Sequence, residues 1–278
     1  MRLGVHMPLK GGFAANLKRV KENGGETIQI FSGNPTAWKM APPNRKEIGK
    51  RIVLAREQSI FPLVIHSAYL INLASSTPEF LDKSSSLLNE TMERASLYEA
   101  PYVVLHVGNH GGAGVERGLE QVVEIISRSL PRWPGGVKLL LENTAGGGTA
   151  LGSTFEELAR VLRNFTPDDV GVCLDTAHGW AAGYDFGSAE GVQELLEQFE
   201  GLIGLEYLFA LHLNDAKVAR GSRVDRHEHI GRGQIGLEGF RELLRQPWPA
   251  EMPAILETPE MGSEWDRKNL DAIRALLR

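Results

Sequence analysis

The sequence contains very little cysteine and no long apolar run. Cys173 is the only cysteine among 278 residues, so the chain forms no disulfide within itself, and its apolar surroundings are typical of a core residue. No apolar run approaches the roughly 18 residues that a membrane span requires, and the first residues lack the apolar stretch of a secretory signal. We therefore expect a cytoplasmic protein that has no membrane partner.

The chain also lacks an excess of basic residues and any low-complexity linker. It has 30 Lys and Arg against 35 Asp and Glu, a formal net charge of −5. This balance alone argues against a polyanionic partner, although bound divalent cations would change the charge locally. Barrels of alternating strands and helices commonly use about 200–250 residues as one domain. We therefore expect a single domain over residues 1–278.

Eight short apolar runs recur along the chain, and segments with helical periodicity separate them. The runs cover residues 2–6, 27–31, 63–66, 103–106, 139–142, 170–175, 209–212 and 254–257. Continuously apolar strands are typical of a parallel sheet that helices cover. The pattern predicts an α/β fold, a (β/α)8 TIM barrel. A doubly wound open sheet is the alternative fold.

From the third run onward, all six runs end in a histidine or a carboxylate, and further such residues follow closely. They are His66, His106, Glu142, Asp175, His212 and Glu257 at the run ends, with His178, Asp225 and His227 just beyond. In a parallel barrel the C-terminal ends of all strands open on one face. The sequence therefore predicts that these nine side chains converge there.

Imidazole and carboxylate ligands without thiolate suit zinc, manganese or iron. At three or four protein ligands for each ion, nine ligands predict two or three ions, particularly if one carboxylate bridges. A single histidine at a strand end is more often a hydrogen-bonded loop residue, but that explanation does not account for six such ends. Neighbouring metal ions can clamp a phosphodiester and stabilise its in-line displacement.

The segment 231–236 matches the dinucleotide-binding pattern G-x-G-x-x-G letter by letter. That motif requires a preceding strand and a later acidic residue within a βαβ unit. Polar residues 225–229 precede it here. We therefore interpret the segment as a loop and helix start, and we expect no nucleotide cofactor.

Several longer motifs resemble the endonuclease IV family of apurinic/apyrimidinic (AP) endonucleases. They are residues 141–146 (LENTAG), 170–178 (VGVCLDTAH), 182–185 (AGYD), 212–217 (HLNDAK) and 221–227 (GSRVDRH). The resemblance extends from about residue 4 to residue 259, nearly the whole chain, with the motifs in the expected order.

This resemblance implies a (β/α)8 barrel with three zinc ions, with Mn²⁺ or Fe²⁺ as an alternative at one site. It assigns His66, His106 and Glu142 to the first ion, with Glu142 bridging to the second. Asp175, His212 and Glu257 complete the second site, and His178, Asp225 and His227 form the third. Four carboxylates against three divalent ions would leave the site cationic.

The resemblance further implies hydrolysis of DNA on the 5′ side of an abasic site, leaving a 3′-hydroxyl and a 5′-deoxyribose phosphate. It also implies removal of groups that block 3′ ends. A metal-bridging hydroxide would be the nucleophile, and Glu142 would be the catalytic residue that orients it. The expected partner is therefore double-stranded DNA with abasic sites or blocked 3′ ends.

DNA contacts are expected in loops that the family inserts into the minor groove. Tyr69, Leu70 and Asn72 are the candidate wedge residues, and Asn34 and Trp38 match a second loop. That second loop departs from the family, because Thr36 or Ala37 stands where some members have arginine. Lys10, Lys39 and Lys217 are candidate phosphate contacts, and His229 and Arg232 receive no role.

Two other functions are compatible with such a barrel. Sugar isomerases and epimerases use a quartet like Glu142, Asp175, His212 and Glu257, but they would not need the other five ligands. A non-catalytic binder of damaged DNA would usually have lost a ligand, and none is missing. We expect a monomer, because one barrel completes the site.

Overall fold

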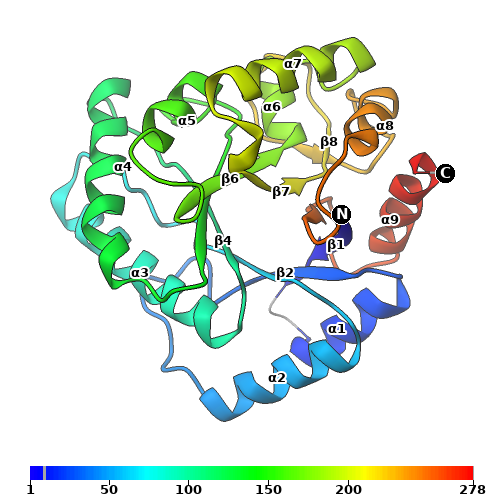
Figure 1. Cartoon of the computed structure of the whole chain (residues 1–278), viewed down its shortest axis with the longest axis horizontal. Coiled ribbons are helices and arrows are strands. Elements are labelled where there is room, and N and C mark those ends of the chain that lie inside the picture. The colour runs from blue at the N-terminus through cyan, green and yellow to red at the C-terminus, as the bar shows by residue number, and fades with distance from the viewer. Residues whose placement is uncertain (9–10, 278) are drawn as a thin grey trace.

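The computed structural model describes residues 1–8 and 11–277, which form a closed barrel of eight parallel strands in a single domain (Figure 1). The barrel strands are β1 (Arg2–His6), β2 (Thr27–Phe31), β3 (Leu63–His66), β4 (Tyr102–His106), β5 (Lys138–Glu142), β6 (Val170–Asp175), β7 (Leu208–His212) and β10 (Pro253–Leu256). β1 pairs with both β2 and β10, which closes the sheet. The predicted barrel is confirmed, and the alternative of an open sheet is wrong.

Helices surround this barrel, as Figure 1 shows. They are α1 (Phe13–Glu22), α2 (Arg45–Glu57), α3 (Pro78–Leu97), α4 (Val115–Ser129), α5 (Phe155–Leu162), α6 (Thr176–Ala182), α7 (Ala189–Leu202), α8 (Glu238–Arg245) and α9 (Trp265–Leu276), with 3-10 turns η1 (Leu130–Arg132) and η2 (Leu205–Tyr207). Thr154 caps the start of α5 by accepting a hydrogen bond from Glu157 N at 3.2 Å.

Two small elements were not predicted from the sequence, and both follow barrel strands. Helix α6 begins directly after β6, because the Asp175 side chain caps it by accepting from His178 N. Strands β8 (Asp215–Ala216) and β9 (His227–Glu228) form a two-stranded antiparallel sheet after β7. Both elements present candidate metal ligands.

The barrel interior contains an apolar layer directly beneath the candidate ligands. Its members are Val64, Val104, Leu140, Cys173 and Ala210, which form one buried cluster. Each stands two residues before His66, His106, Glu142, Asp175 or His212, and side chains two apart on a strand share a face. The layer therefore forms a dry floor for the polar site. Cys173 is buried in it, as predicted for a core residue.

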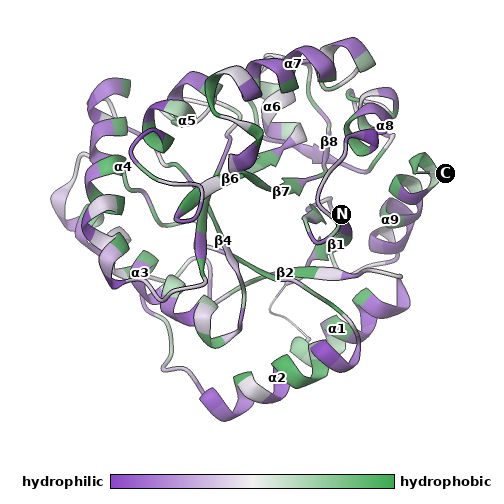
Figure 2. Ribbon diagram, viewed as in Figure 1, coloured by the Kyte–Doolittle hydropathy of each residue, from purple (hydrophilic) through white to green (hydrophobic). Residues whose placement is uncertain are grey.

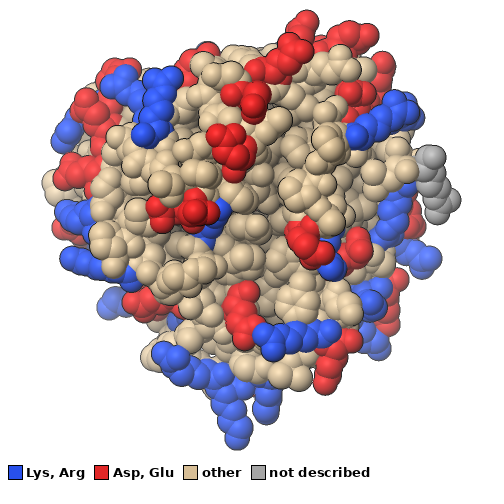
Figure 3. All heavy atoms as spheres, in the orientation of Figure 1, with Lys and Arg blue, Asp and Glu red and all other residues tan. Residues whose placement is uncertain are grey.

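The outer surface is polar and carries both signs of charge. Figure 2 shows hydrophilic residues along the outer sides of the helices, and Figure 3 shows Lys and Arg interspersed with Asp and Glu on one face. Among the described residues, no helix has the length and apolar character needed to cross a membrane.

Candidate metal centre

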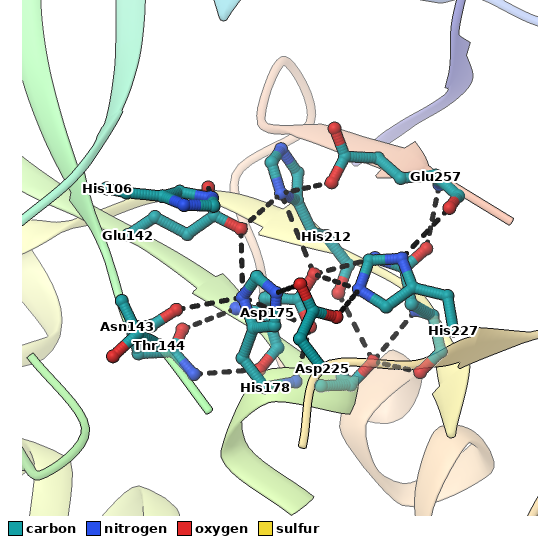
Figure 4. A network of polar contacts seen from close by, with 12 residues as sticks. His106, Glu142, Asn143, Thr144, Asp175, His178, His212, Asp225, His227 and Glu257 are labelled. Carbon is teal, nitrogen blue, oxygen red and sulfur yellow. Dashed lines mark hydrogen bonds and ion pairs between the residues drawn. The ribbon is translucent and has the colours of Figure 1, made fainter. Parts of the chain in front are cut away.

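The strand register brings the predicted ligands to one level at the C-terminal end of the barrel. His106 pairs with Glu142 across β4 and β5, and Asp175 pairs with His212 across β6 and β7. Glu257 directly follows β10. Figure 4 shows these side chains pointing toward one another from their different strands.

Three groups of side chains present ligand atoms that all lie within 4.8 Å of one another. The groups are His66, His106 and Glu142; Glu142, Asp175, His212 and Glu257; and Asp175, His178 and His227. Asp225 lies beside the third group, with Oδ2 3.3 Å from His178 Nε2 and Oδ1 3.2 Å from His227 Nε2. The structure thus brings together all nine residues singled out in the sequence.

Glu142 stands at the centre of this arrangement. Its Oε2 atom lies 3.2 Å from His66 Nε2 and 3.1 Å from His106 Nε2. Its Oε1 atom lies 2.9 Å from His212 Nδ1 and 3.2 Å from His178 Nδ1. The two oxygens therefore face different groups, which is the geometry that a bridging carboxylate needs.

The electrostatics of the site favour cations. Burial alone would raise the pKa of the Glu142 carboxyl, but the His212 and His106 imidazoles hold it well below its usual range. Burial disfavours the charged form of His212, yet the nearby carboxylates of Glu257 and Glu142 raise its pKa well above the usual value. Burial likewise opposes charge on His227, and Asp225 raises the pKa of His227 to about 9. The buried Glu142 carboxylate thus stays ionised and attracts positive charge.

The residues present fit divalent metal ions. His227 Nε2 is buried, and within the described part of the chain it makes no well-directed hydrogen bond, although Asp225 Oδ1 lies 3.2 Å away; a nitrogen in this position is suited to serve as a ligand. The donor set contains only imidazole nitrogens and carboxylate oxygens, which suits zinc, manganese or iron. A cavity of about 210 Å³ lies against this set, and His66, His106, His178, His227 and Glu257 line it.

Backbone carbonyls orient three of the imidazoles. His66 Nδ1 donates to Ser67 O at 2.8 Å, His178 Nδ1 to Asn143 O at 2.9 Å, and His227 Nδ1 to Glu257 O at 2.9 Å. In the neutral ring, the form that binds a metal ion, a donating Nδ1 leaves the lone pair on Nε2. The Nε2 atoms of these rings are therefore available as ligands.

Two buried asparagines that the sequence analysis passed over hold the carboxylates. Asn143 Oδ1 accepts from Asp175 N at 2.6 Å, and Asn214 Nδ2 donates to Asp175 Oδ2 at 2.6 Å. Asn214 Oδ1 also accepts from Glu257 N at 2.7 Å. Asn143 follows Glu142 directly and Asn214 follows His212 by two residues, so proximity to a ligand was the available signal.

The glycine-rich segment 231–236 wraps around a carboxylate of the chain itself. Asp215 accepts hydrogen bonds at 2.8–3.0 Å from the backbone nitrogens of Ala216, Gly231, Gly233 and Ile235. A Cβ atom at Gly233 would lie 2.4 Å from Ala216 O. The segment forms a loop that leads into α8, as predicted. Beside it, His229 and Arg232 both stack on Trp265.

A cleft of about 670 Å³ adjoins the metal centre, and four of the five predicted DNA contacts line it. They are Trp38, Tyr69, Leu70 and Asn72. Tyr69 is 60% exposed, with its ring 5.8 Å from that of His66. Asn72 ties this loop to the next one, because its amide donates to Asn109 O and accepts from Asn109 N. Asn34 does not line the cleft, and its side chain accepts from Thr36.

The segment between β8 and β9 carries an exposed basic residue at every third position, and only Lys217 among them was predicted as a phosphate contact. These residues are Lys217, Arg220, Arg223 and Arg226. Lys217 N donates to Arg226 O at 2.9 Å, so the segment folds back as a hairpin. Arg223 lines the cleft. Lys39 is exposed as well, and Lys10 lies outside the described residues.

Comparison with known proteins identifies the family. Residues 17–278 match the family described as xylose isomerase-like TIM barrel. A protein of Natranaerobius thermophilus named Probable endonuclease 4 is 45% identical, across 100% of this chain and 98% of the relative. The chain belongs to the endonuclease IV family of AP endonucleases. It is therefore an endonuclease, which confirms the predicted family and class of enzyme.

Solved structures agree with this assignment. Endonuclease IV from Thermus thermophilus matches with a TM-score of 0.86 and 35% identity, covering 100% of this chain and 99% of that one. A D-tagatose 3-epimerase-like protein matches with a TM-score of 0.75 but only 19% identity, covering 100% and 97%. The second likeness concerns the fold alone.

Proposed function

We propose that this endonuclease IV homologue uses three zinc ions to hydrolyse DNA on the 5′ side of abasic sites, leaving a 3′-hydroxyl and a 5′-deoxyribose phosphate. The same site would remove groups that block 3′ ends. The observation that carries this proposal is the position of Glu142, whose two carboxylate oxygens face two different groups of ligands.

The residues that would hold the ions are those of the three groups. His66, His106 and Glu142 would hold the first ion, Glu142, Asp175, His212 and Glu257 the second, and His178, Asp225 and His227 the third. Bound there, zinc would activate a water molecule and neutralise the charge that develops on the phosphate and the leaving oxygen. Mn²⁺ or Fe²⁺ at one site would serve the same chemistry.

The chain's own side chains would contribute to the reaction in two ways: they orient the attacking water molecule, and they keep bulk water out of the site. Glu142 is the proposed catalytic residue, because its buried, ionised carboxylate can accept a hydrogen bond from the attacking water and so orient it. The apolar floor beneath the ligands keeps the site dry, which strengthens its electrostatic interactions. No side chain needs to act as a covalent nucleophile.

DNA would bind over the cleft beside the metal centre. Tyr69 and Leu70 would wedge into the base stack, and this costs less at a site where the base is missing. Asn72 and Trp38 would support that loop from within the cleft, while Asn34 would contact DNA from the outer side of its own loop. The basic hairpin 217–226 would neutralise phosphates.

One barrel supplies the whole site, so we propose a monomeric enzyme that acts in the cytoplasm on double-stranded DNA. Metal analysis tests the proposal. Purified protein should contain about three zinc ions per chain, and prolonged chelation should abolish cleavage of an abasic duplex until zinc is restored. Fewer than two ions, with Mn²⁺-dependent isomerisation of a ketose and no DNA cleavage, would favour the sugar-acting alternative.

A further inference from the structure

Gln29 on β2 links two candidate ligands that come from different strands. Its side chain is fully buried. Its amide nitrogen lies 2.7 Å from Glu257 Oε1, and its amide oxygen lies 3.0 Å from His212 Nε2. The amide nitrogen also lies 2.8 Å from His6 Nδ1. One amide group thus serves three neighbours without facing the open cavity.

The chemistry of these neighbours determines which way the amide points. An ionised carboxylate only accepts hydrogen bonds, so the amide nitrogen must face Glu257. The amide oxygen then faces His212, and it requires that His212 Nε2 carry the proton. In the neutral ring that a metal ion requires, the lone pair of His212 consequently lies on Nδ1. That atom is 2.9 Å from Glu142 Oε1 and 3.0 Å from Glu257 Oε2, inside the second ligand group.

The same amide also selects the free oxygen of Glu257. Oε1 of Glu257 receives the hydrogen bond from Gln29 and lies 3.1 Å from His6 Nδ1. Oε2 is the oxygen that faces His212 Nδ1. Without the amide the carboxylate could rotate and the imidazole could exchange its proton between nitrogens, and neither side chain would keep a single ligand atom toward the site.

We propose that Gln29 is a positioning residue for the second metal site, fixing the ligand nitrogen of His212 and the ligand oxygen of Glu257. The proposal rests on the three-metal function proposed above. Partners of this kind outside the ligand set typically alter metal affinity or activity by about 10- to 100-fold. We expect an effect of this size on one of the three ions.

The test uses Gln29→Met, which keeps the length of the side chain and removes its hydrogen bonds to His212 and Glu257. Zinc retained after dialysis against graded chelator should fall by one ion per chain at a concentration that leaves the wild type fully loaded. Two-bond ¹H–¹⁵N spectra of zinc-loaded protein labelled at histidine should lose the single Nε2-protonated form of His212. His212→Gln identifies the signal by its absence.

A second variant separates the two parts of the role. Gln29→Glu retains an oxygen that can accept from His212, so the Nε2-protonated form should persist, but the carboxylate cannot donate to Glu257. Gln121→Met is the matched control. Gln121 is also buried and donates to Ser75 O, yet it lies on α4, away from the ligands, so zinc retention should match the wild type.

The outcomes separate this inference from the proposed function. Wild-type protein that retains no zinc would contradict the function itself. Wild type with three ions, together with unchanged zinc retention and an unchanged His212 form in Gln29→Met, would overturn the role of Gln29 alone. If Gln29→Met does not fold, the spectrum of Gln29→Glu tests the role instead. Loss of the Nε2-protonated form of His212 in Gln29→Glu would also overturn the role of Gln29.

Discussion

Glu142 and His212 meet at the C-terminal end of the barrel, with Oε1 of the carboxylate 2.9 Å from Nδ1 of the imidazole. Both side chains are fully buried, and they come from β5 and β7, which are not adjacent in the sheet. The other oxygen of Glu142 faces His66 and His106. This one carboxylate therefore joins ligand groups on opposite sides of the site, and its removal should affect both.

Replacing Glu142 by Gln is expected to abolish cleavage while leaving the barrel folded. The amide removes a negative charge that two ligand groups share, and cleavage should slow by at least about 100-fold, as when a preorganised transition-state contact is lost. Single-turnover cleavage of an abasic duplex and metal content measure the effect. Glu156→Gln, on the exposed side of α5, is the matched control. Near-normal turnover would contradict the assigned role.

Tyr69→Ala is expected to weaken binding to abasic DNA without changing metal content. The ring is 60% exposed beside the cleft, so it is available to stack on bases, and such contacts contribute about 1–3 kcal/mol each. Titration with labelled abasic duplex should show about a tenfold or greater loss of affinity. Leu205→Ala, an exposed apolar residue on η2, should bind like the wild type. Equal wild-type affinity for intact and abasic duplex would remove the basis of this prediction.

The sequence predicted the barrel and the convergence of its polar strand ends, because apolar runs and their terminal residues are local features. The contacts that orient these residues could not be predicted in the same way. Gln29 approaches His212 across 183 positions of sequence, and only strand register brings them together. Likewise, the hairpin 217–226 depends on the pairing of β8 with β9. Each of these strands has two residues, too few to show a repeating pattern of apolar and polar residues in the sequence.

Gly233→Ala should destabilise the loop that wraps Asp215. A Cβ there would lie 2.4 Å from both Ala216 O and Asp215 Oδ1, so the backbone must move, at a cost of about 1–3 kcal/mol. Denaturant unfolding measures the change. Gly49→Ala in α2 is the control, because nothing lies within 4 Å of its Cβ position and alanine should favour the helix by up to about 1 kcal/mol. A Gly233→Ala protein as stable as the wild type would contradict this account of the loop.

Asp266 should make the protein less stable as pH rises from about 4 to 6. Burial raises the pKa of its carboxyl to about 6, above the unfolded value of about 3.9. Over this interval Asp266 retains in the folded state a proton that it releases in the unfolded chain, so its contribution to the free energy of unfolding should fall, by at most about 3 kcal/mol. Asp266→Asn keeps an acceptor for Gly262 N and should reduce this pH dependence. Denaturant unfolding of both proteins at each pH measures the effect. If the free energy of unfolding changed with pH in the same way in Asp266→Asn and in the wild type, the prediction would be contradicted.

Cleavage of a duplex that contains one synthetic abasic site tests the central claim most directly. The reaction is run without added Mg²⁺ and with only brief exposure to EDTA, and the ends are mapped. We predict one incision on the 5′ side of the lesion, leaving a 3′-hydroxyl and a 5′-deoxyribose phosphate. Zinc-loaded protein that leaves the strand intact, or cuts it on the 3′ side, would contradict the account.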